Sequence, residues 1–252
     1  MDNTPNGLAA LLRQTLGAQW RHLHPDIRAR FTLAPGATRQ RFTGGMSTIE
    51  RSFIGWLIAR LIAFVRVLPS VRARDVPFEF NLTATPDGGW IKERLYHFRA
   101  GLFEFRSVMR IEATGELIEN FPYGLCMKIK LAAEGDALLF LDDGYFLRIG
   151  AFRLAIPRWA SAGQFTLTHT NIDRENFTVA IRLDHPLFGR LFYQCGRFVE
   201  SRLCANPNLH PAPAASTGNA RPGGLPDNPP TPASAFLTRQ ALLRHIGLGT
   251  ER

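Results

Sequence analysis

The sequence predicts an α+β fold, mainly β, in which a curved antiparallel β-sheet or barrel-like meander of about nine or ten strands packs with two N-terminal helices. Apolar residues near the N-terminus recur at three- and four-residue steps. From Val76 to about Leu203 the period becomes two residues, which is typical of strands with one buried face. Most connections there are too short for crossover helices, so neighbouring strands should be antiparallel.

Two helical segments are expected before the strands. The first covers residues 7–31 and is interrupted at His24-Pro25; its apolar positions are Leu8, Leu11, Leu12, Leu16, Trp20 and Leu23. Residues 32–46 are predicted to be a loop. The second helix runs from Ser47 to Leu68, because Ser47 and Glu50 have the spacing of a capping box and Pro69 follows. Arginines inside this segment argue against a membrane span and favour a buried or interfacial helix.

The strands are expected in sequence order, joined by turns. Pro86-Asp87-Gly88-Gly89 predicts a turn before a returning strand, and Asp142-Asp143-Gly144 predicts a hairpin. The expected strands are 78–83, 90–98, 103–111, 125–131, 137–141, 145–149, 152–156, 164–170, 177–183 and 188–198.

The chain is expected to hold one domain, residues 7–204. Residues 205–234 are rich in Pro, Ala, Asn and Gly, which predicts a disordered linker. A short C-terminal helix is expected over residues 235–247.

Charge and cysteine content limit the class of protein. The net charge is +9, and residues 1–75 hold 11 basic and 4 acidic side chains. This excess fits either an arginine-rich genome or an anionic partner such as a membrane surface. Nucleic acid is disfavoured, because no zinc-finger, RNA-recognition or helix-turn-helix pattern is present. Three cysteines without C-x-x-C spacing and a polar N-terminus favour the cytoplasm, with peripheral contact at the inner membrane face if lipid is the partner.

No motif of a known reaction is present in the sequence. Phosphate-binding glycine loops, the G-x-S-x-G elbow and H-E-x-x-H are absent, so no cofactor or metal site is predicted. Glu93, His97 and Glu119 are the candidates for an acid or base if the protein is an enzyme.

Charged residues on neighbouring strands leave two interpretations open. Glu93, Arg94, Arg106, Arg110 and Glu119 form a polar binding site if their face points inward, because buried charges must be paired. If it points outward, they form cross-strand pairs at the surface. The alternating Phe103, Phe105, Met109 and Ile111 look like core, which favours the outward interpretation.

Ordered landmarks resemble the family known as domain of unknown function 4166 over Leu23 to about Val199. They are Leu23-His24, Gly36, Arg41-Phe42-Thr43-Gly44, Leu68-Pro69, Trp90, Arg94, Phe98, Phe105-Arg106-Ser107, Glu119, Phe121, Leu154-Ala155-Ile156-Pro157, Phe177-Thr178-Val179, Pro186-Leu187-Phe188-Gly189, Tyr193 and Gly196. In some relatives the domain follows a saccharopine-dehydrogenase-like dinucleotide-binding domain. The resemblance therefore implies an NAD(P)-dependent oxidoreductase as a partner, and it supplies no catalytic residues.

The leading functional interpretation is a non-catalytic module that binds an apolar or amphipathic ligand, such as a hydrophobic small molecule or lipid, with a membrane surface as one place of action. The alternatives are an accessory subunit or domain of an oxidoreductase and an enzyme that uses the acid–base candidates above. The expected ligand-binding residues are Trp90, Arg94, Phe98, Phe105, Arg106, Glu119 and Tyr193.

Overall fold

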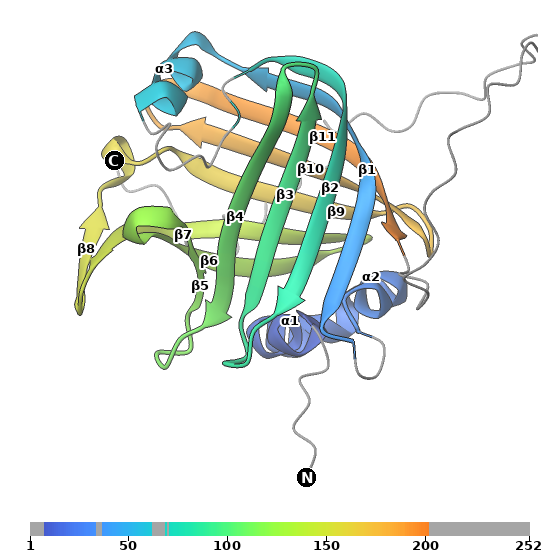
Figure 1. Cartoon of the computed structure of the whole chain (residues 1–252). Coiled ribbons are helices and arrows are strands. Elements are labelled where there is room, and N and C mark those ends of the chain that lie inside the picture. Colours follow the sequence, from blue (N-terminus) through green and yellow to red (C-terminus); the bar gives the residue numbers. More distant parts are fainter. Residues whose placement is uncertain (1–7, 34–36, 62–68, 70, 202–252) are drawn as a thin grey trace, which may run out of the picture. The chain divides into compact units, whose positions relative to one another are not determined.

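The computed structural model describes residues 8–33, 37–61, 69 and 71–201, and within them the chain is a closed antiparallel barrel of ten strands (Figure 1). The barrel strands are β1 (Arg39–Arg51), β2 (Ala73–Ala84), β3 (Trp90–Phe98), β4 (Gly101–Ile111), β5 (Leu117–Asn120), β6 (Leu125–Glu134), β7 (Ala137–Ile149), β9 (Gln164–Asn171), β10 (Asn176–His185) and β11 (Gly189–Ser201). Pairing of β6 with β7 and of β1 with β11 closes the ring. The predicted fold class is confirmed.

One further strand lies outside the ring. β8 (Phe152–Ile156) pairs with the second half of β7, while the first half of β7 pairs with β9. β7 is therefore continuous through Asp142-Asp143-Gly144, and the predicted hairpin there is wrong. At this point β7 leaves β9 and begins to pair with β8. Gly144 has a φ of 108°, a conformation that favours glycine and that lets the strand bend between its two partners.

The N-terminal helices lie at one end of the barrel, at the bottom of Figure 1. α1 (Leu8–Leu16) buries its leucines in the main core, the 3-10 turn η1 (Gly17–His22) follows, and α2 (Pro25–Arg30) begins where His24-Pro25 predicts a break. The His24 side chain accepts a hydrogen bond from the Asp26 backbone N–H, which caps α2. Ala133 N–H donates to Gln19 Oε1, which joins η1 to the end of β6.

The region after these helices differs from the prediction. Residues from Arg39 to Arg51 form β1, so neither a loop over 32–46 nor a helix beginning at Ser47 is correct there. The helix α3 runs only over Phe53–Leu61, and Gly55 N–H donates to Ser52 Oγ at its start. β1 is paired on both sides, by β2 and β11, and these backbone hydrogen bonds outweigh the local capping signal.

Some predictions fall on residues that are not described. These are the end of the predicted second helix at 62–68, part of the predicted loop at 34–36, the linker 205–234 and the C-terminal helix 235–247. β5 is a strand that the sequence analysis did not predict.

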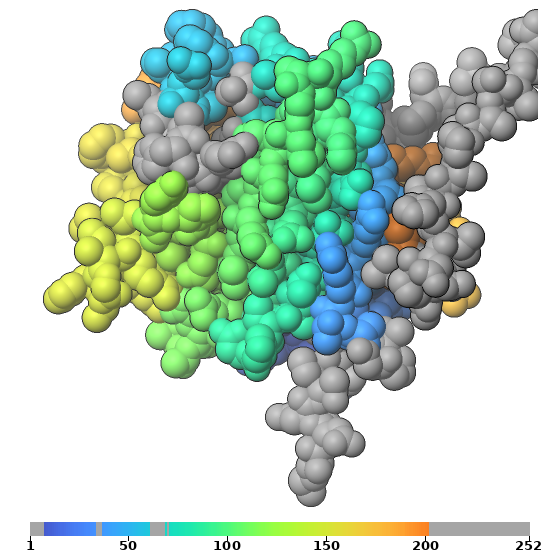
Figure 2. Space-filling model, in the orientation of Figure 1, coloured from blue at the N-terminus to red at the C-terminus, as the bar shows by residue number. Residues whose placement is uncertain are grey.

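The outer surface of β2, β3 and β4 forms the front of the molecule in Figure 2. α3 packs against the start of β11, where Ser52 N–H donates to the Leu191 carbonyl, and lies at the upper left of Figure 1. Among the described helices, none is long and apolar enough to cross a membrane.

Candidate functional site

The inward faces of the barrel strands surround a cavity of about 280 Å³. Phenylalanine is the commonest residue of the wall, and seven of the ten barrel strands contribute it: Phe42, Phe78, Phe80, Phe105, Phe140, Phe165, Phe177, Phe192 and Phe198. Leu8 and Phe31 line the cavity at the end covered by the N-terminal helices. Ala160 of the 3-10 turn η4 (Arg158–Ala160) also lines it and is itself exposed, so the cavity reaches solvent beside η4.

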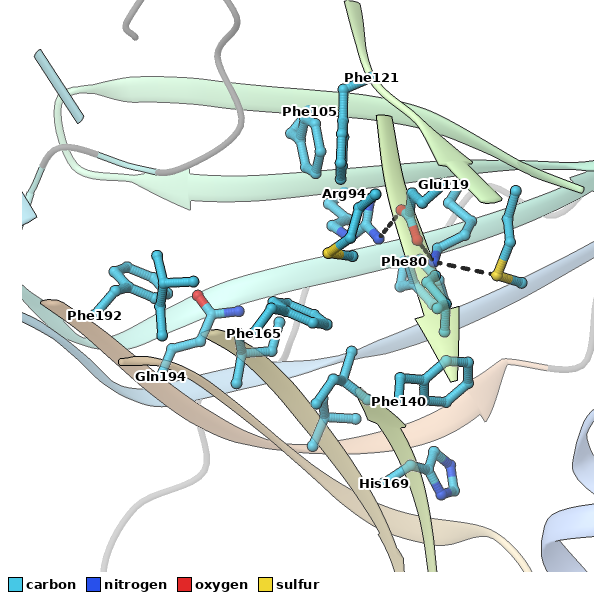
Figure 3. Close-up of a pocket in the computed structure, with 18 of the residues that line it drawn as sticks. Phe80, Arg94, Phe105, Glu119, Phe121, Phe140, Phe165, His169, Phe192 and Gln194 are labelled. Atoms are coloured by element: carbon cyan, nitrogen blue, oxygen red, sulfur yellow. Dashed lines mark hydrogen bonds and ion pairs between the residues drawn. The ribbon is translucent and has the colours of Figure 1, made fainter. Parts of the chain in front are cut away.

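Four polar side chains meet on one wall of this apolar space. The two-residue period of β3 puts Lys92 and Arg94 on the inward face, between the buried Trp90 and Tyr96. Ser107 of β4 is opposite Lys92 in the register, and Glu119 of β5 is opposite Met109. The strand pairing therefore brings Lys92, Arg94, Ser107 and Glu119 together, and we call them the lumen cluster. Figure 3 shows two of its members, Arg94 and Glu119, side by side.

Glu119 is the centre of the lumen cluster. Its Oε2 lies 2.5 Å from Lys92 Nζ, and its Oε1 lies 3.1 Å from Arg94 Nη2. Ser107 Oγ donates to the same Oε1 at 2.5 Å and accepts a hydrogen bond from Arg94 Nη1 at 3.0 Å. The Arg94 guanidinium also faces the ring of Phe105, with 4.7 Å from Cζ to the ring centroid. The cluster is a fixed network rather than a set of independent side chains.

Burial and charge set the ionisation of the lumen cluster. Burial would raise the pKa of Glu119, but the charges of Lys92 and Arg94 and the hydrogen bonds from Lys92 and Ser107 outweigh it and lower the pKa to about 2. Burial lowers the pKa of Lys92 to about 8, against the attraction of Glu119. At neutral pH Glu119 is therefore a carboxylate and Lys92 is mostly an ammonium.

Three more polar side chains, Tyr96, Gln194 and His169, face the cavity away from this cluster. Tyr96 and Gln194 are both buried, and the Gln194 amide nitrogen donates to the Tyr96 oxygen at 3.1 Å. His169 is buried between the rings of Phe31 and Phe177, and neither of its ring nitrogens has a hydrogen-bond partner among the described residues. Burial and the nearby charge of Arg30 lower the pKa of His169 to about 3, so it is uncharged.

The expected ligand-binding residues separate into two groups. Arg94, Phe105 and Glu119 line the cavity. The other four do not line the cavity. Trp90 is buried in the core, and Phe98 stacks on Tyr96. Arg106 faces outward, and Tyr193 lines a groove beside β1 and β11.

The outward interpretation of the charged strand residues is correct for some and wrong for others. Arg106 and Glu93 are outside, where they form an ion pair of 2.9 Å, and Arg110 is outside with Asp87. Arg94 and Glu119 are inside. The reason is the alternation itself, since Glu93 and Arg94 are adjacent and must face opposite sides of the sheet.

The three acid–base candidates do not form one site. Glu93 pairs with Arg106 on the outer surface, and His97 lies 3.4 Å from Glu79, also outside. Glu119 alone is in the cavity, and its low pKa keeps it deprotonated. In the described part of the chain, no group of three or more His, Cys, Asp or Glu side chains is placed to hold a metal ion.

Lys92, Ser107, Gln194 and His169 were not predicted as site residues from the sequence. For Lys92 a signal was available, because it shares a strand face with Trp90, and only three lysines occur in the chain. Gln194 and His169 come from strands whose neighbours across the barrel are far away in sequence, so their position could not be read from local pattern.

A second, basic groove lies outside the barrel next to α3. It has a volume of about 520 Å³, and four of its lining residues are arginines: Arg51, Arg72, Arg74 and Arg190. Arg72 donates two hydrogen bonds to the Arg51 carbonyl, at 2.9 and 2.7 Å. Glu50 is the acidic residue in the described lining. The groove is therefore strongly positive.

Comparison with known proteins identifies the family of this chain. No curated protein matches the chain. A family profile described as "Domain of unknown function (DUF4166)" matches residues 23–198. This range covers α2 and all of the barrel except the end of β11. The chain therefore belongs to the DUF4166 family.

Proposed function

We propose that this protein is a binding module that holds one small apolar or amphipathic molecule inside its barrel. The observation that carries the proposal is an interior that its own side chains do not fill. Phe80, Leu167, Val179 and Ile181 face the cavity, yet each is only partly buried. Natural cores are close-packed, so inward apolar side chains with accessible surface indicate room for a guest.

The wall chemistry supports this ligand class. Most of the lining is aromatic or aliphatic, which favours an apolar guest because burying apolar surface contributes about 25 cal/mol per Å². The lumen cluster and the Tyr96–Gln194 pair supply a few fixed polar groups that could orient it. A volume of about 280 Å³ is near the lower end of the roughly 300–1,000 Å³ typical of ligand pockets.

The test is native mass spectrometry of the protein purified from its own host, with a matched pair of variants. Val179→Trp places a large ring in the cavity, whereas Thr178→Trp places it on the outer face of the same strand. We expect a co-purified small molecule with the wild type and with Thr178→Trp, and none with Val179→Trp. A wild-type protein without any bound molecule, which also fails to take up a hydrophobic fluorescent probe, would contradict the proposal.

A membrane surface is the second part of the proposed function. Exposed apolar side chains stand beside the place where the cavity reaches solvent. Trp159 adjoins the lining residue Ala160 and is 68% exposed, and Tyr123, between the lining residues Phe121 and Leu125, is 71% exposed. The Trp159 carbonyl lies 3.1 Å from His185 Nε2, and His185 stacks on the exposed Phe188.

Basic side chains lie close to these exposed aromatic residues. Arg158 and Arg190 are exposed next to Trp159 and Phe188, and the groove beside α3 adds Arg72 and Arg74. Aromatic side chains with nearby arginines suit the headgroup region of an anionic bilayer, where each cation contributes about 1 kcal/mol. A ligand could then pass between the bilayer and the cavity.

Vesicle co-sedimentation tests this second part. We expect binding to phosphatidylserine-containing vesicles that weakens as salt rises, because exposed charge is screened over about 10 Å at 0.1 M. The double variant Trp159→Ala, Phe188→Ala and the double variant Arg72→Glu, Arg74→Glu should both reduce binding. Ile172→Ala, an exposed apolar residue in the β9–β10 turn beside α2, is the control and should bind normally. Equal sedimentation with and without vesicles at low salt would refute the membrane contact.

An oxidoreductase partner remains a prediction that the family resemblance alone supports. Affinity purification from the host, with the partner identified by its dinucleotide-binding activity, is the measurement for it.

A further inference from the structure

We infer that the ligand is a single-chain amphipath with a carboxylate headgroup, and that Arg94 and Lys92 bind this headgroup while the phenylalanine wall holds the chain. The inference rests on the proposed function and names its ligand class.

The charge balance inside the barrel is the first observation. Among the described residues that line the cavity, the side chains charged at neutral pH are Lys92, Arg94 and Glu119. They leave one positive charge in excess. The side chains of Lys92 and Arg94 are only 8% and 11% exposed, so water reaches this charge poorly. An unbalanced charge in an apolar enclosure is costly, and one bound anion would balance it.

The donor geometry is the second observation. A guanidinium carries five N–H donors. Among the described residues, Arg94 makes one bond to Ser107 and one to Glu119, which occupy two of the five. Phe105 and Phe80 lie over the guanidinium, at 4.7 and 5.5 Å from its Cζ to their ring centroids, and restrict its orientation. An oriented guanidinium with remaining donors suits the planar, two-oxygen carboxylate.

The surroundings decide between anions. A dianionic phosphate would replace one excess positive charge with one excess negative charge in the same apolar space. A carboxylate brings the sum to zero. Beyond the cluster, the cavity wall is apolar toward Phe140 and Phe165, which suits an alkyl chain (Figure 3). Uncharged His169 stands deeper, at the end of the cavity covered by the N-terminal helices.

The experiment compares three probes with the same chain and different headgroups: dodecanoate, dodecan-1-ol and dodecylamine. Binding to the full-length protein is measured at pH 7 by displacement of a fluorescent probe. We expect dodecanoate to bind at least about tenfold more tightly than dodecan-1-ol, since hydrogen bonds to charged groups are among the stronger ones. Dodecylamine should bind most weakly, because its cation meets Arg94 and Lys92.

Variants then locate the preference. Arg94→Gln should bring dodecanoate and dodecan-1-ol within about threefold of each other, mainly by weakening dodecanoate. Arg94→Lys keeps the charge and should retain part of the preference, which guards against a folding defect in the glutamine variant. Arg106→Gln removes an arginine of the neighbouring strand that faces outward, and should behave as wild type.

The outcomes separate this inference from the proposed function. If wild type binds dodecanoate and dodecan-1-ol equally, the cluster is structural, the carboxylate assignment is wrong, and the binding module stands. A preference that survives in Arg94→Gln would also overturn the assignment. If none of the three probes binds to the folded protein, both the carboxylate assignment and the proposed function fail for ligands with an alkyl chain of this length.

Discussion

Glu119 holds together the two cations of the lumen cluster, and this makes it the most sensitive side chain of the interior. It accepts from Lys92, Arg94 and Ser107, and each partner is mostly buried. Removing one partner of a buried ion pair leaves a charge without compensation, which costs far more than the pair contributes when intact.

We therefore expect Glu119→Gln to lower the free energy of unfolding by about 3–5 kcal/mol, measured by urea denaturation. Glu93→Gln is the matched control from the outer face, where its pair with Arg106 should contribute less than about 1 kcal/mol. Similar losses in the two variants would show that the lumen cluster is more hydrated than its burial indicates.

The pKa of Lys92 gives a second prediction at this scale, for the binding of the dodecanoate probe. Lys92 faces Glu119 of β5, Arg94 of its own strand, Met109 of β4 and the ring of Phe140 of β7. Burial lowers its pKa to about 8, so Lys92 loses its proton as the pH rises from 7 to 9. The excess positive charge of the cavity then falls to zero.

Dodecanoate affinity should therefore decrease between pH 7 and pH 9, while dodecan-1-ol affinity should stay constant. Arg94 and Glu119 keep their charges over this range, and burial holds the pKa of Tyr145 well above 10, so it stays neutral. Lys92→Met should remove the pH dependence. A parallel decline for both probes would point to a change of the barrel rather than to Lys92.

At the scale of elements, a strand could be predicted where its own sequence pattern marks it, and could not where its strand state depends on hydrogen bonds to distant partners. The strands from β2 to β4 were predictable because each has a clear two-residue alternation and a marked turn. β1 was not, since Gly44-Gly45 interrupts its alternation and Ser47-x-x-Glu50 imitates a helix start. Its strand state depends on two partners, one of which lies about 150 residues further along the chain.

The same limit applies to the candidate site. Arg94, Phe105 and Glu119 could be selected from the sequence as binding residues. Their inward orientation required the register, and a shift of one residue would have turned each of them outward. The cavity itself is a property of ring closure, which no local pattern encodes.

The glycines that hindered the prediction of β1 have a structural use, which gives a third prediction. A Cβ at Gly44 would lie 2.1 Å from the Arg197 carbonyl oxygen, so β1 and β11 approach closely at the seam that closes the barrel. At Gly45 the nearest atom would be 3.6 Å away, an ordinary contact.

Gly44→Ala should therefore destabilise the protein by about 1–3 kcal/mol or prevent its folding, because backbone must move at the seam. Gly45→Ala should change stability by less than about 1 kcal/mol. Thermal melts followed by circular dichroism compare the two. Equal melting temperatures would mean that the seam is looser than described.

At the scale of the whole molecule, the barrel combines a closed ring with an interior that is incompletely filled. Closure removes the exposed edges that an open sheet of this size would have. The N-terminal helices cover one end, where Arg30 donates to Asn171 Oδ1 and to the Asp173 carbonyl in the β9–β10 turn. The empty volume inside lacks the contacts of a packed core, so a guest should stabilise the folded state.

This gives the fourth prediction, a rise in melting temperature on ligand binding. A ligand that binds only the folded protein and is present at about 100 times its Kd adds roughly 2.7 kcal/mol of stability. For a domain of this size each kcal/mol corresponds to about 2–4 °C, so dodecanoate at that level should raise Tm by roughly 5–10 °C.

The variant Val179→Trp is the decisive comparison for this prediction, because its ring occupies the space that the ligand would take. Its melting temperature should not respond to dodecanoate, whereas Thr178→Trp, on the outer face of β10, should respond as wild type does. If all three proteins show the same rise, dodecanoate stabilises them from outside the barrel. The partly exposed inward side chains would then reflect a loosely packed core and not a binding site, because only a guest inside the cavity is excluded by a ring at position 179.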